Sequence, residues 1–364
     1  MAVDCLVVGG GLIGMLSARE LALAGQRVTI LERGAAGQES SWAGGGILSP
    51  LYPWRYPAAV TLLAQWGQPR YRALADALFE QTGIDPEWQQ GGLLMLDQAD
   101  LVDQAEAFAW AENYGVALER LQGDAVSRCE PAVGAHRGQA LWMPEVAQIR
   151  NPRLLQALRI SLEALGVVFI EQTEVLGLQQ QSGQVSGVET SQGIYTADKV
   201  VIASGAWSGA LLDGVGDPLA VEPVRGQMLL YKGAPGLLNT IVMSEGHYAI
   251  PRRDGHVLVG STVEYVGFDK STTQSAADSL RQIAERLVPA LAEAEVKRHW
   301  AGLRPGSAAG VPYIGGHPEI AGLFINTGHF RNGVVLGVAS ARLLGDLLLG
   351  RSSGFDASLY AIER

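Results

Sequence analysis

The stretch LVVGGGLIGM, residues 6–15, decides the fold of this chain. It joins an apolar run, residues 3–8, which predicts a buried strand, to a helix predicted over residues 11–24. A second apolar segment, residues 27–31, follows as another strand. The sequence therefore predicts a β-α-β unit at the start of the chain, with a glycine-rich turn between its first strand and its helix.

The turn has the spacing G-x-G-x-x-G, and its glycines are Gly9, Gly11 and Gly14. The first permits a tight turn, the second lets the backbone approach a pyrophosphate, and the third lets the helix pack against the strand. Glu32 ends the second strand, close to the spacing of about 20 residues at which a carboxylate binds the ribose of a dinucleotide. The pattern favours an ADP-containing dinucleotide, NAD or FAD; the alternative is a packing turn beside a surface glutamate.

The length of 364 residues favours two domains or one large interrupted domain, and a hydrophobic content of 48% allows a sizeable core. A net charge of −10 disfavours a nucleic-acid partner, since phosphate binding needs clustered basic residues. Cys5 and Cys129 are the only cysteines, which favours a reducing compartment. Because the sequence shows neither a signal-peptide pattern nor an uncharged apolar run of about 20 residues, we expect a cytoplasmic protein without a membrane partner.

Beyond a loop over residues 34–57, helices and strands alternate. Helices are predicted over residues 58–82, 98–116 and 152–165, and strands over residues 167–171, 185–190 and 194–203. Residues 220–301 differ, because short alternating strands dominate and one helix, residues 275–288, interrupts them. This block predicts an antiparallel sheet of the kind that forms a substrate domain. A strand over residues 322–327 and a helix over residues 333–349 follow.

Three later stretches carry a more specific signal: VVIASGAWS (200–208), HWAGLRPGS (299–307) and INTGHFRNGVVLG (325–337). Together with the N-terminal turn and the segment ESSWAGGGILSP (39–50), they resemble the FAD-dependent amine and amino-acid oxidases of the D-amino-acid oxidase type. Within that family the chain is most similar to the glycine-oxidising branch of the thiamine pathway. The resemblance covers nearly the whole chain, and GLRPG followed by GHFRNG is its specific part.

The resemblance implies an α/β fold in which a discontinuous Rossmann-type FAD-binding domain carries an α+β substrate domain built on an antiparallel sheet. It assigns residues 1–82, 146–218 and 302–364 to the FAD-binding domain, and residues 83–145 and 219–301 to the substrate domain. Monomeric sarcosine oxidases attach flavin through a cysteine late in the chain. No cysteine follows Cys129 here, so a non-covalent FAD is expected. The resemblance also implies a homo-oligomer, for example a homotetramer.

The implied activity is oxidation of a small amino acid, such as glycine, sarcosine or a small D-amino acid, to an imine, while molecular oxygen is reduced to hydrogen peroxide. The imine hydrolyses to glyoxylate or another 2-oxo acid and ammonia, or passes to thiazole synthesis. Since the cofactor accepts the hydride, the protein has to position the carbon, exclude water and take a neutral amine. A desolvated amine loses its proton readily, so no dedicated base is needed. The histidines show no metal-ligand spacing, and no metal is expected.

Matching motifs assign a set of residues to FAD. The ADP part would contact the glycine turn and the end of the second strand, at Gly9, Gly11, Leu12, Ile13, Gly14, Glu32 and Arg33, and the adenine would meet Val175. The diphosphate and the isoalloxazine would pass Ser40, Ser41, Gly45, Gly46 and Ile47, and Gly205 is also assigned to the cofactor site. The pyrimidine side of the flavin would lie along His329, Phe330, Arg331, Asn332, Gly333, Val334 and Val335. Independently, a helix N-terminus at this last segment favours the negative charge of a reduced flavin.

An amino-acid substrate needs an anchor for its carboxylate, and arginine supplies a planar two-pronged donor. Arg304, expected in a Gly/Pro turn, is predicted to be that anchor; the alternative is a structural salt bridge. Arg331 has a weaker claim, since it can instead orient the flavin and the active-site loop. Tyr248 is predicted to bind the carboxylate or shape the pocket; the alternative is a core tyrosine. At Val263 the resemblance implies an apolar side chain near the substrate.

Three alternatives stay open from the sequence. Sarcosine, D-alanine or D-proline can be the preferred substrate, because pocket volume decides among them. The chain can instead be a dehydrogenase that passes electrons to a membrane quinone, although it has no basic amphipathic anchor. It can also be a flavin-binding protein without turnover, which the presence of both Arg304 and Tyr248 disfavours.

Overall fold

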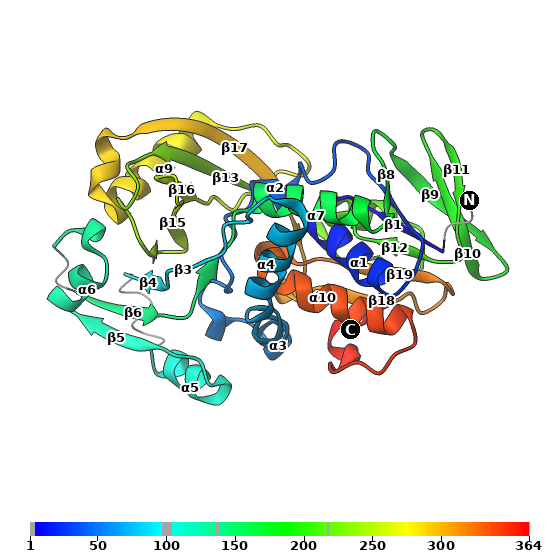
Figure 1. The fold of residues 1–364 in the computed structure, drawn as a ribbon, viewed down its shortest axis with the longest axis horizontal. Coiled ribbons are helices and arrows are strands. Elements are labelled where there is room, and N and C mark those ends of the chain that lie inside the picture. Colours follow the sequence, from blue (N-terminus) through cyan, green and yellow to red (C-terminus); the bar gives the residue numbers. More distant parts are fainter. Residues whose placement is uncertain (1–3, 97–103, 136–137, 217, 364) are drawn as a thin grey trace.

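The structure is a computed structural model that describes residues 4–96, 104–135, 138–216 and 218–363. Figure 1 shows an elongated molecule with a six-stranded sheet near the N-terminus and an eight-stranded sheet whose far strands lie at the opposite end. The long strands β13 (Glu222–Lys232) and β17 (Glu295–Gly306) reach from the second sheet toward the first. Within these ranges, none of the helices combines the length and the apolar character needed to cross a bilayer.

The six-stranded sheet contains the predicted β-α-β start. In spatial order its strands are β18 (Tyr313–Gly316), β19 (Leu323–Thr327), β12 (Val200–Ile202), β1 (Cys5–Val8), β2 (Val28–Leu31) and β8 (Val168–Ile170). Neighbouring strands are parallel except for β18 and β19. Because a parallel sheet is covered on both faces, its central strands are mostly apolar, and every residue of β1 and β2 is buried.

Alternate side chains of β1 enter two different cores. Cys5 and Val7 pack with a helical layer on one face, formed by α1 (Leu12–Leu23), α3 (Ala58–Gly67), α4 (Arg70–Thr82), α7 (Asn151–Ala164) and α10 (Gly333–Leu348). Leu6 and Val8 pack on the other face. That face is covered by an antiparallel sheet of β9 (Val175–Gln181), β10 (Gln184–Thr190) and β11 (Gly193–Thr196). The period-two alternation of one buried strand thus builds a three-layer arrangement.

The predicted antiparallel block forms most of the eight-stranded sheet. Its spatial order is β17, β13, β16 (His256–Gly260), β15 (His247–Pro251), β14 (Ile241–Ser244), β4 (Leu93–Met95), β6 (Gln139–Met143) and β5 (Glu119–Gln122). All pairs are antiparallel except β14 with β4. Helix α9 (Gln274–Leu287) covers one face through Leu280 and Ile283, and the side chain of Thr273 caps it by accepting from the N–H of Ala276.

Several predicted elements differ in detail. Residues 58–82 form two helices, because Pro69 begins the second one and its ring nitrogen cannot continue the first. The helix predicted over residues 98–116 is α5 (Gln104–Tyr114), and residues 98–103 lie outside the described residues. Residues 194–203 form two strands of different sheets, β11 and β12. The shorter α-helices and strands of the described chain are α2 (Ser40–Ala43), β3 (Gln89–Gln90), α6 (Asp124–Cys129), β7 (Ala147–Gln148) and α8 (Ser208–Leu211).

The Gly/Pro turn predicted around Arg304 is instead a regular part of β17. Gly302, Pro305 and Gly306 suggested a turn, but β17 is the outermost strand of its sheet, and an edge strand tolerates proline. Arg304 pairs with Val224 of β13. The predicted anchor therefore stands on a strand held by its neighbour, and not on a loop.

Candidate active site

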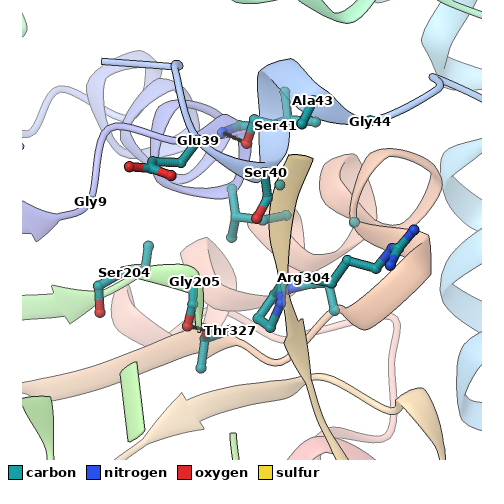
Figure 2. A pocket seen from close by; sticks show the side chains of 18 of the residues that line it. Gly9, Glu39, Ser40, Ser41, Ala43, Gly44, Ser204, Gly205, Arg304 and Thr327 are labelled. Carbon is teal, nitrogen blue, oxygen red and sulfur yellow. Dashed lines mark hydrogen bonds between the residues drawn. The ribbon is translucent and has the colours of Figure 1, made fainter. Parts of the chain in front are cut away.

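An open cavity lies at the carboxyl ends of the parallel strands, where the six-stranded sheet meets β13 and β17. Residues that end or directly follow β1, β2, β12 and β19 line it: Val8, Leu31, Ala203 and Thr327. Ligands of open α/β sheets bind at this edge. Figure 2 shows Gly9, the α2 segment, Gly205 and Arg304 around the same space.

Most of the predicted site residues line this cavity. They are Gly9, Gly11, Leu12, Ile13, Glu32, Arg33, Ser40, Ser41, Gly45, Gly46, Ile47, Val175, Gly205, Tyr248, Arg304, His329, Phe330, Arg331, Gly333 and Val334. Gly14, Asn332 and Val335 are buried but lie outside the lining. Val263 also lies outside it and is 42% exposed, and its place near the substrate stays a prediction.

The glycine turn is packed too tightly for side chains. Gly9 has a φ of +108°, and a Cβ on it would lie 2.5 Å from the carbonyl oxygen of Ala203. A Cβ on Gly14 would overlap the carbonyl oxygen of Gly9, so the third glycine lets α1 start directly against the turn. Leu12 and Ile13 then bring the first turn of α1 to the cavity. Backbone N–H groups at a helix start suit a phosphate; of these, the N–H of Leu12 donates to Oγ of Ser41.

The carboxylate of Glu32 is fixed at the cavity wall. It is 9% exposed, and its two oxygens accept from the backbone N–H groups of Gly10 at 2.8 Å and Gly34 at 2.9 Å. Next to it, the guanidinium carbon of Arg33 lies 3.6 Å from the ring centroid of Trp207, which also lines the cavity. This end therefore offers a carboxylate acceptor and a cation packed on an aromatic face, which suit a ribose and an adenine.

The loop that contains Gly45 and Gly46 is held by two hydrogen bonds and by close backbone packing. Asn151 donates to the carbonyl oxygen of Ser41 at 2.8 Å, and Arg252 donates to that of Gly45 at 2.7 Å. Gly46 has a φ of +76°, and a Cβ there would overlap the carbonyl oxygen of Ile149. The glycines thus form a fixed stretch of bare backbone, which allows a flat ring to approach closely.

Arg304 donates hydrogen bonds to the protein but faces no carboxylate within the described residues. Nη1 donates to the carbonyl oxygens of Thr262 at 3.1 Å and Arg225 at 3.3 Å, and Nη2 donates to Oγ of Ser261 at 2.6 Å. Burial lowers the pKa of Arg304 from its usual value, while the neighbouring Tyr248 raises it. An arginine keeps its charge in proteins, so the cavity contains a positive charge that an anionic ligand can neutralise.

Tyr248 and Arg331 lie in the same lining as Arg304. Tyr248 is 7% exposed, and a Cβ on Gly45 would lie 3.4 Å from its Cε2 atom, so the ring stands beside the glycine loop. Arg331 donates from Nη2 to the carbonyl oxygen of Gly246 at 3.1 Å. The structure therefore brings together the three polar side chains predicted for the substrate, on β15, β17 and the segment before α10.

His329 is a buried, neutral member of the lining. Its Nε2 lies 2.9 Å from Oγ of Ser340, and its Nδ1 has no hydrogen-bond partner within the described residues. Burial lowers the pKa of His329 to about 3, since nothing compensates a charge there. His329 thus places an uncharged imidazole, with one unused ring nitrogen, at the start of α10.

Some lining residues escaped the sequence predictions, among them Glu39, Trp207, Gly226, Met228 and Asn326. Gly226 and Met228 are two positions apart in β13 and therefore lie on the same face of the strand. The sequence contained this period-two pattern. Trp207 stacks on Phe268 with ring centroids 5.6 Å apart, a contact between segments that no local pattern relates.

The residues present fit FAD. Bare glycine backbone lines the cavity both at the strand-to-helix turn and in the α2 loop, and at Gly9 and Gly46 no Cβ would fit. The N-termini of α1 and α10 both open into the cavity, through Leu12 and Gly333. One helix start suits a diphosphate and the other suits the negative charge of a reduced flavin. FAD carries both groups.

Comparisons with known proteins agree with this geometry. The family model described as DAO, FAD dependent oxidoreductase, matches residues 4–347. A Pseudomonas aeruginosa protein named glycine oxidase is 52% identical, and the match covers 99% of each chain. A Trichormus variabilis protein named bifunctional protein ThiO/ThiG is 32% identical over 97% of this chain and 54% of its own length. The crystal structure of glycine oxidase from Geobacillus kaustophilus matches with a TM-score of 0.94 and 31% identity, over 100% of this chain and 99% of that one. The chain therefore belongs to the DAO family of FAD-dependent oxidoreductases.

Proposed function

We propose that this protein is an FAD-dependent oxidase of glycine and other small amines, including small D-amino acids. The substrate amine is oxidised to an imine while O₂ is reduced to H₂O₂, and water converts the imine to a 2-oxo acid and ammonia. For glycine the final organic product is glyoxylate. Two relatives named glycine oxidase, 52% and 49% identical over nearly the full chain, support the choice of substrate.

One observation carries the proposal. The guanidinium of Arg304, which has no carboxylate partner within the described residues, lines the same cavity as the Gly9–Gly11 turn that suits a dinucleotide. The contacts of Arg304 among the described residues go to two carbonyl oxygens and one hydroxyl, which favours the anchor role over the alternative of a structural salt bridge. A positive charge beside a flavin site suits an amino-acid substrate, because a carboxylate can pair with it in two parallel hydrogen bonds.

The chain's own residues would act by binding, orienting and desolvating the substrate. FAD, when bound, supplies the acceptor for the hydride that leaves the α-carbon. Arg304 would hold the carboxylate, and Tyr248, 7% exposed beside the glycine loop, would bound the space around it. Burial of the amino group favours its neutral form, so the lone pair is available for imine formation without a dedicated base.

Three further parts of the proposal concern the setting of the reaction. We propose that the imine can serve thiazole formation in the thiamine pathway, which similarity to a protein named bifunctional protein ThiO/ThiG supports. We expect a cytoplasmic homo-oligomer, for example a tetramer. Light scattering of the purified protein measures its oligomeric state. We also propose that the six-stranded and eight-stranded sheets mark the FAD-binding and substrate domains; the boundary assigned from the sequence between residues 301 and 302 falls inside β17.

A peroxide assay over a panel of amines tests the proposal. Glycine, sarcosine, D-alanine and D-proline are compared under air, each with and without an added quinone. The proposal expects H₂O₂ in amounts equal to the O₂ consumed, and the highest kcat/KM for glycine. A higher kcat/KM for sarcosine, D-alanine or D-proline would contradict glycine as the preferred substrate. Turnover only with the quinone would show that the protein is a dehydrogenase and not an oxidase.

A further inference from the structure

Arg304 lies against a bare position of the neighbouring strand. Both Arg304 and Gly226 of β13 line the cavity, and a Cβ on Gly226 would overlap the Nη1, Nη2 and Cζ atoms of Arg304. Since these three atoms belong to the guanidinium, the charged group itself, and not only its stem, rests on the Cα of Gly226. The head of an arginine can move, so a side chain at this position would displace the guanidinium before it disturbed the sheet.

The strand register explains why the bare position faces the cavity. Val224 pairs with Arg304, and Gly226 pairs with Gly302, so two glycines stand opposite one another on neighbouring strands. The second glycine has its own neighbour, because a Cβ on Gly302 would lie 2.6 Å from the Cβ of Ala43 in α2. Gly226 thus leaves room for the guanidinium of Arg304, and Gly302 leaves room for Ala43 of α2.

Three acceptors hold the same guanidinium from the protein side. The carbonyl oxygens of Thr262 and Arg225 accept from Nη1, and Oγ of Ser261 accepts from Nη2 at 2.6 Å. Ser261 is 3% exposed, and within the described residues its hydroxyl makes no other side-chain hydrogen bond. An arginine has five N–H donors. These three hydrogen bonds leave two donors, the number that a bidentate carboxylate contact uses. The side chain of Tyr248 also hydrogen-bonds to the guanidinium, so a bound carboxylate would share or displace that contact.

Arg225 of β13, which carries one of these acceptors, is itself fixed. Arg225 is 4% exposed, and its guanidinium pairs with Glu264 at 2.6 Å and Asp269 at 2.5 Å. Its backbone also exchanges two hydrogen bonds with Glu264. The carbonyl oxygen of Arg225, which accepts from Arg304, is thus held in place by both the backbone and the side-chain contacts of Arg225.

We propose that Gly226 and Ser261 are positioning residues for Arg304: the bare Cα of Gly226 sets how deep the guanidinium lies, and the hydroxyl of Ser261 fixes its rotation. The inference rests on the proposed role of Arg304 as the carboxylate anchor. A methyl group at residue 226 pushes the guanidinium into the space that a substrate carboxylate needs. Binding of small carboxylates then weakens, while the dinucleotide end of the cavity is unchanged.

The test uses the FAD-loaded enzyme and acetate, a carboxylate without an amine, with binding followed by the change in flavin absorption. Gly226→Ala is expected to raise the acetate Kd and the glycine KM by about tenfold or more, and Ser261→Ala by about threefold, since contacts to a charged group are misplaced or lost. The effect on kcat should be much smaller, and the FAD Kd should stay within about twofold of wild type.

Gly177→Ala is the matched control. Gly177 also lies in a strand, β9, its φ is negative or extended, and no atom lies within 4 Å of a Cβ placed on it. Its acetate Kd, glycine KM and FAD Kd are expected to equal those of the wild type. A comparable loss in this variant would mean that any added methyl group in a strand weakens the enzyme.

Arg304→Ala separates the inference from the function on which it rests. Wild-type acetate binding in Arg304→Ala would overturn the anchor role itself. Loss of acetate binding in Arg304→Ala, together with wild-type affinity in both Gly226→Ala and Ser261→Ala, would overturn only the positioning inference. If Gly226→Ala fails to take up FAD, it acts through folding, which overturns the role of Gly226, and Ser261→Ala decides the role of Ser261.

Discussion

The hydroxyl oxygen of Ser41 accepts a 2.8 Å hydrogen bond from the backbone N–H of Leu12. Leu12 begins α1, and Ser41 lies in α2, so this bond ties the flavin-side loop to the first turn of the dinucleotide helix. Figure 2 shows Ser41 at this junction, close to Ser40 and Ala43. The two halves of the cavity are therefore joined by a contact between residues far apart in the chain.

Ser41→Ala is expected to raise the FAD Kd about fivefold, because loss of one such hydrogen bond costs roughly 1 kcal/mol. Fluorescence titration of the apoprotein with FAD measures it. Ser352→Ala, at an exposed position near the C-terminus, is the control and should bind FAD as the wild type does. Equal affinities of Ser41→Ala and the wild type would show that this bond does not shape the site.

Arg304→Ala is expected to lower kcat/KM for glycine by roughly 30-fold or more, since removing a charged partner of a buried carboxylate costs about 2–5 kcal/mol. FAD should remain bound, because the glycine turn and the α2 loop are untouched. Arg304→Lys should restore only part of the loss, as lysine keeps the charge but lacks the planar fork. Steady-state peroxide kinetics measure all three proteins, with Arg351→Ala as the exposed control. Near-normal turnover of glycine by Arg304→Ala would contradict the role of Arg304 as the carboxylate anchor.

The buried imidazole of His329 should make stability depend on pH. Its pKa is about 3 in the folded protein, against 6.5 for an ordinary histidine. Between these values the unfolded chain binds a proton that the folded protein does not bind. Stability therefore rises with pH in this window and is lost as pH falls from 6.5 toward 3, by at most about 1.4 kcal/mol per pH unit.

His329→Gln removes the titrating group and should flatten this slope. Urea unfolding at several pH values between 4.5 and 7.5, at a fixed excess of FAD, measures the free energy of unfolding of both proteins. Parallel slopes for the variant and the wild type would mean that His329 does not set the pH dependence.

Loss of Arg225 should destabilise the fold. Its side chain is 5% exposed, while the carboxylates that it pairs with, Glu264 and Asp269, are 25% and 51% exposed. Arg225→Ala leaves a half-buried carboxylate unpaired, and we expect the free energy of unfolding to fall by about 3 kcal/mol. Arg281→Ala breaks an ion pair with Asp278 that is exposed on both sides, so it should cost less than about 1 kcal/mol. Similar urea midpoints for the two variants would contradict the structural role of Arg225.

Local patterns were enough to predict the dinucleotide end of the site. Gly9, Gly11 and Glu32 follow from the backbone demands of one turn and the strand after it, and all three line the cavity. The resemblance added the segments around Ser40 and His329, which form the opposite side. These features could be predicted because each lies within one short, specific motif.

Long-range pairing was the part that local patterns could not supply. Arg304 was expected in a turn because glycine and proline surround it, yet pairing with β13 makes the segment an edge strand. Gly226 gained its importance only from that pairing, since its neighbour Arg304 comes from another strand. Val263 was placed near the substrate by analogy with relatives, but here its side chain is exposed outside the cavity.

The absorption spectrum of the purified protein, recorded before and after glycine is added without air, tests the central claim most directly. The account predicts a flavin band that glycine bleaches rapidly in the wild type, and far more slowly in Arg304→Ala at the same concentration. A colourless protein that takes up no FAD, or equal bleaching rates with and without the arginine, would contradict it.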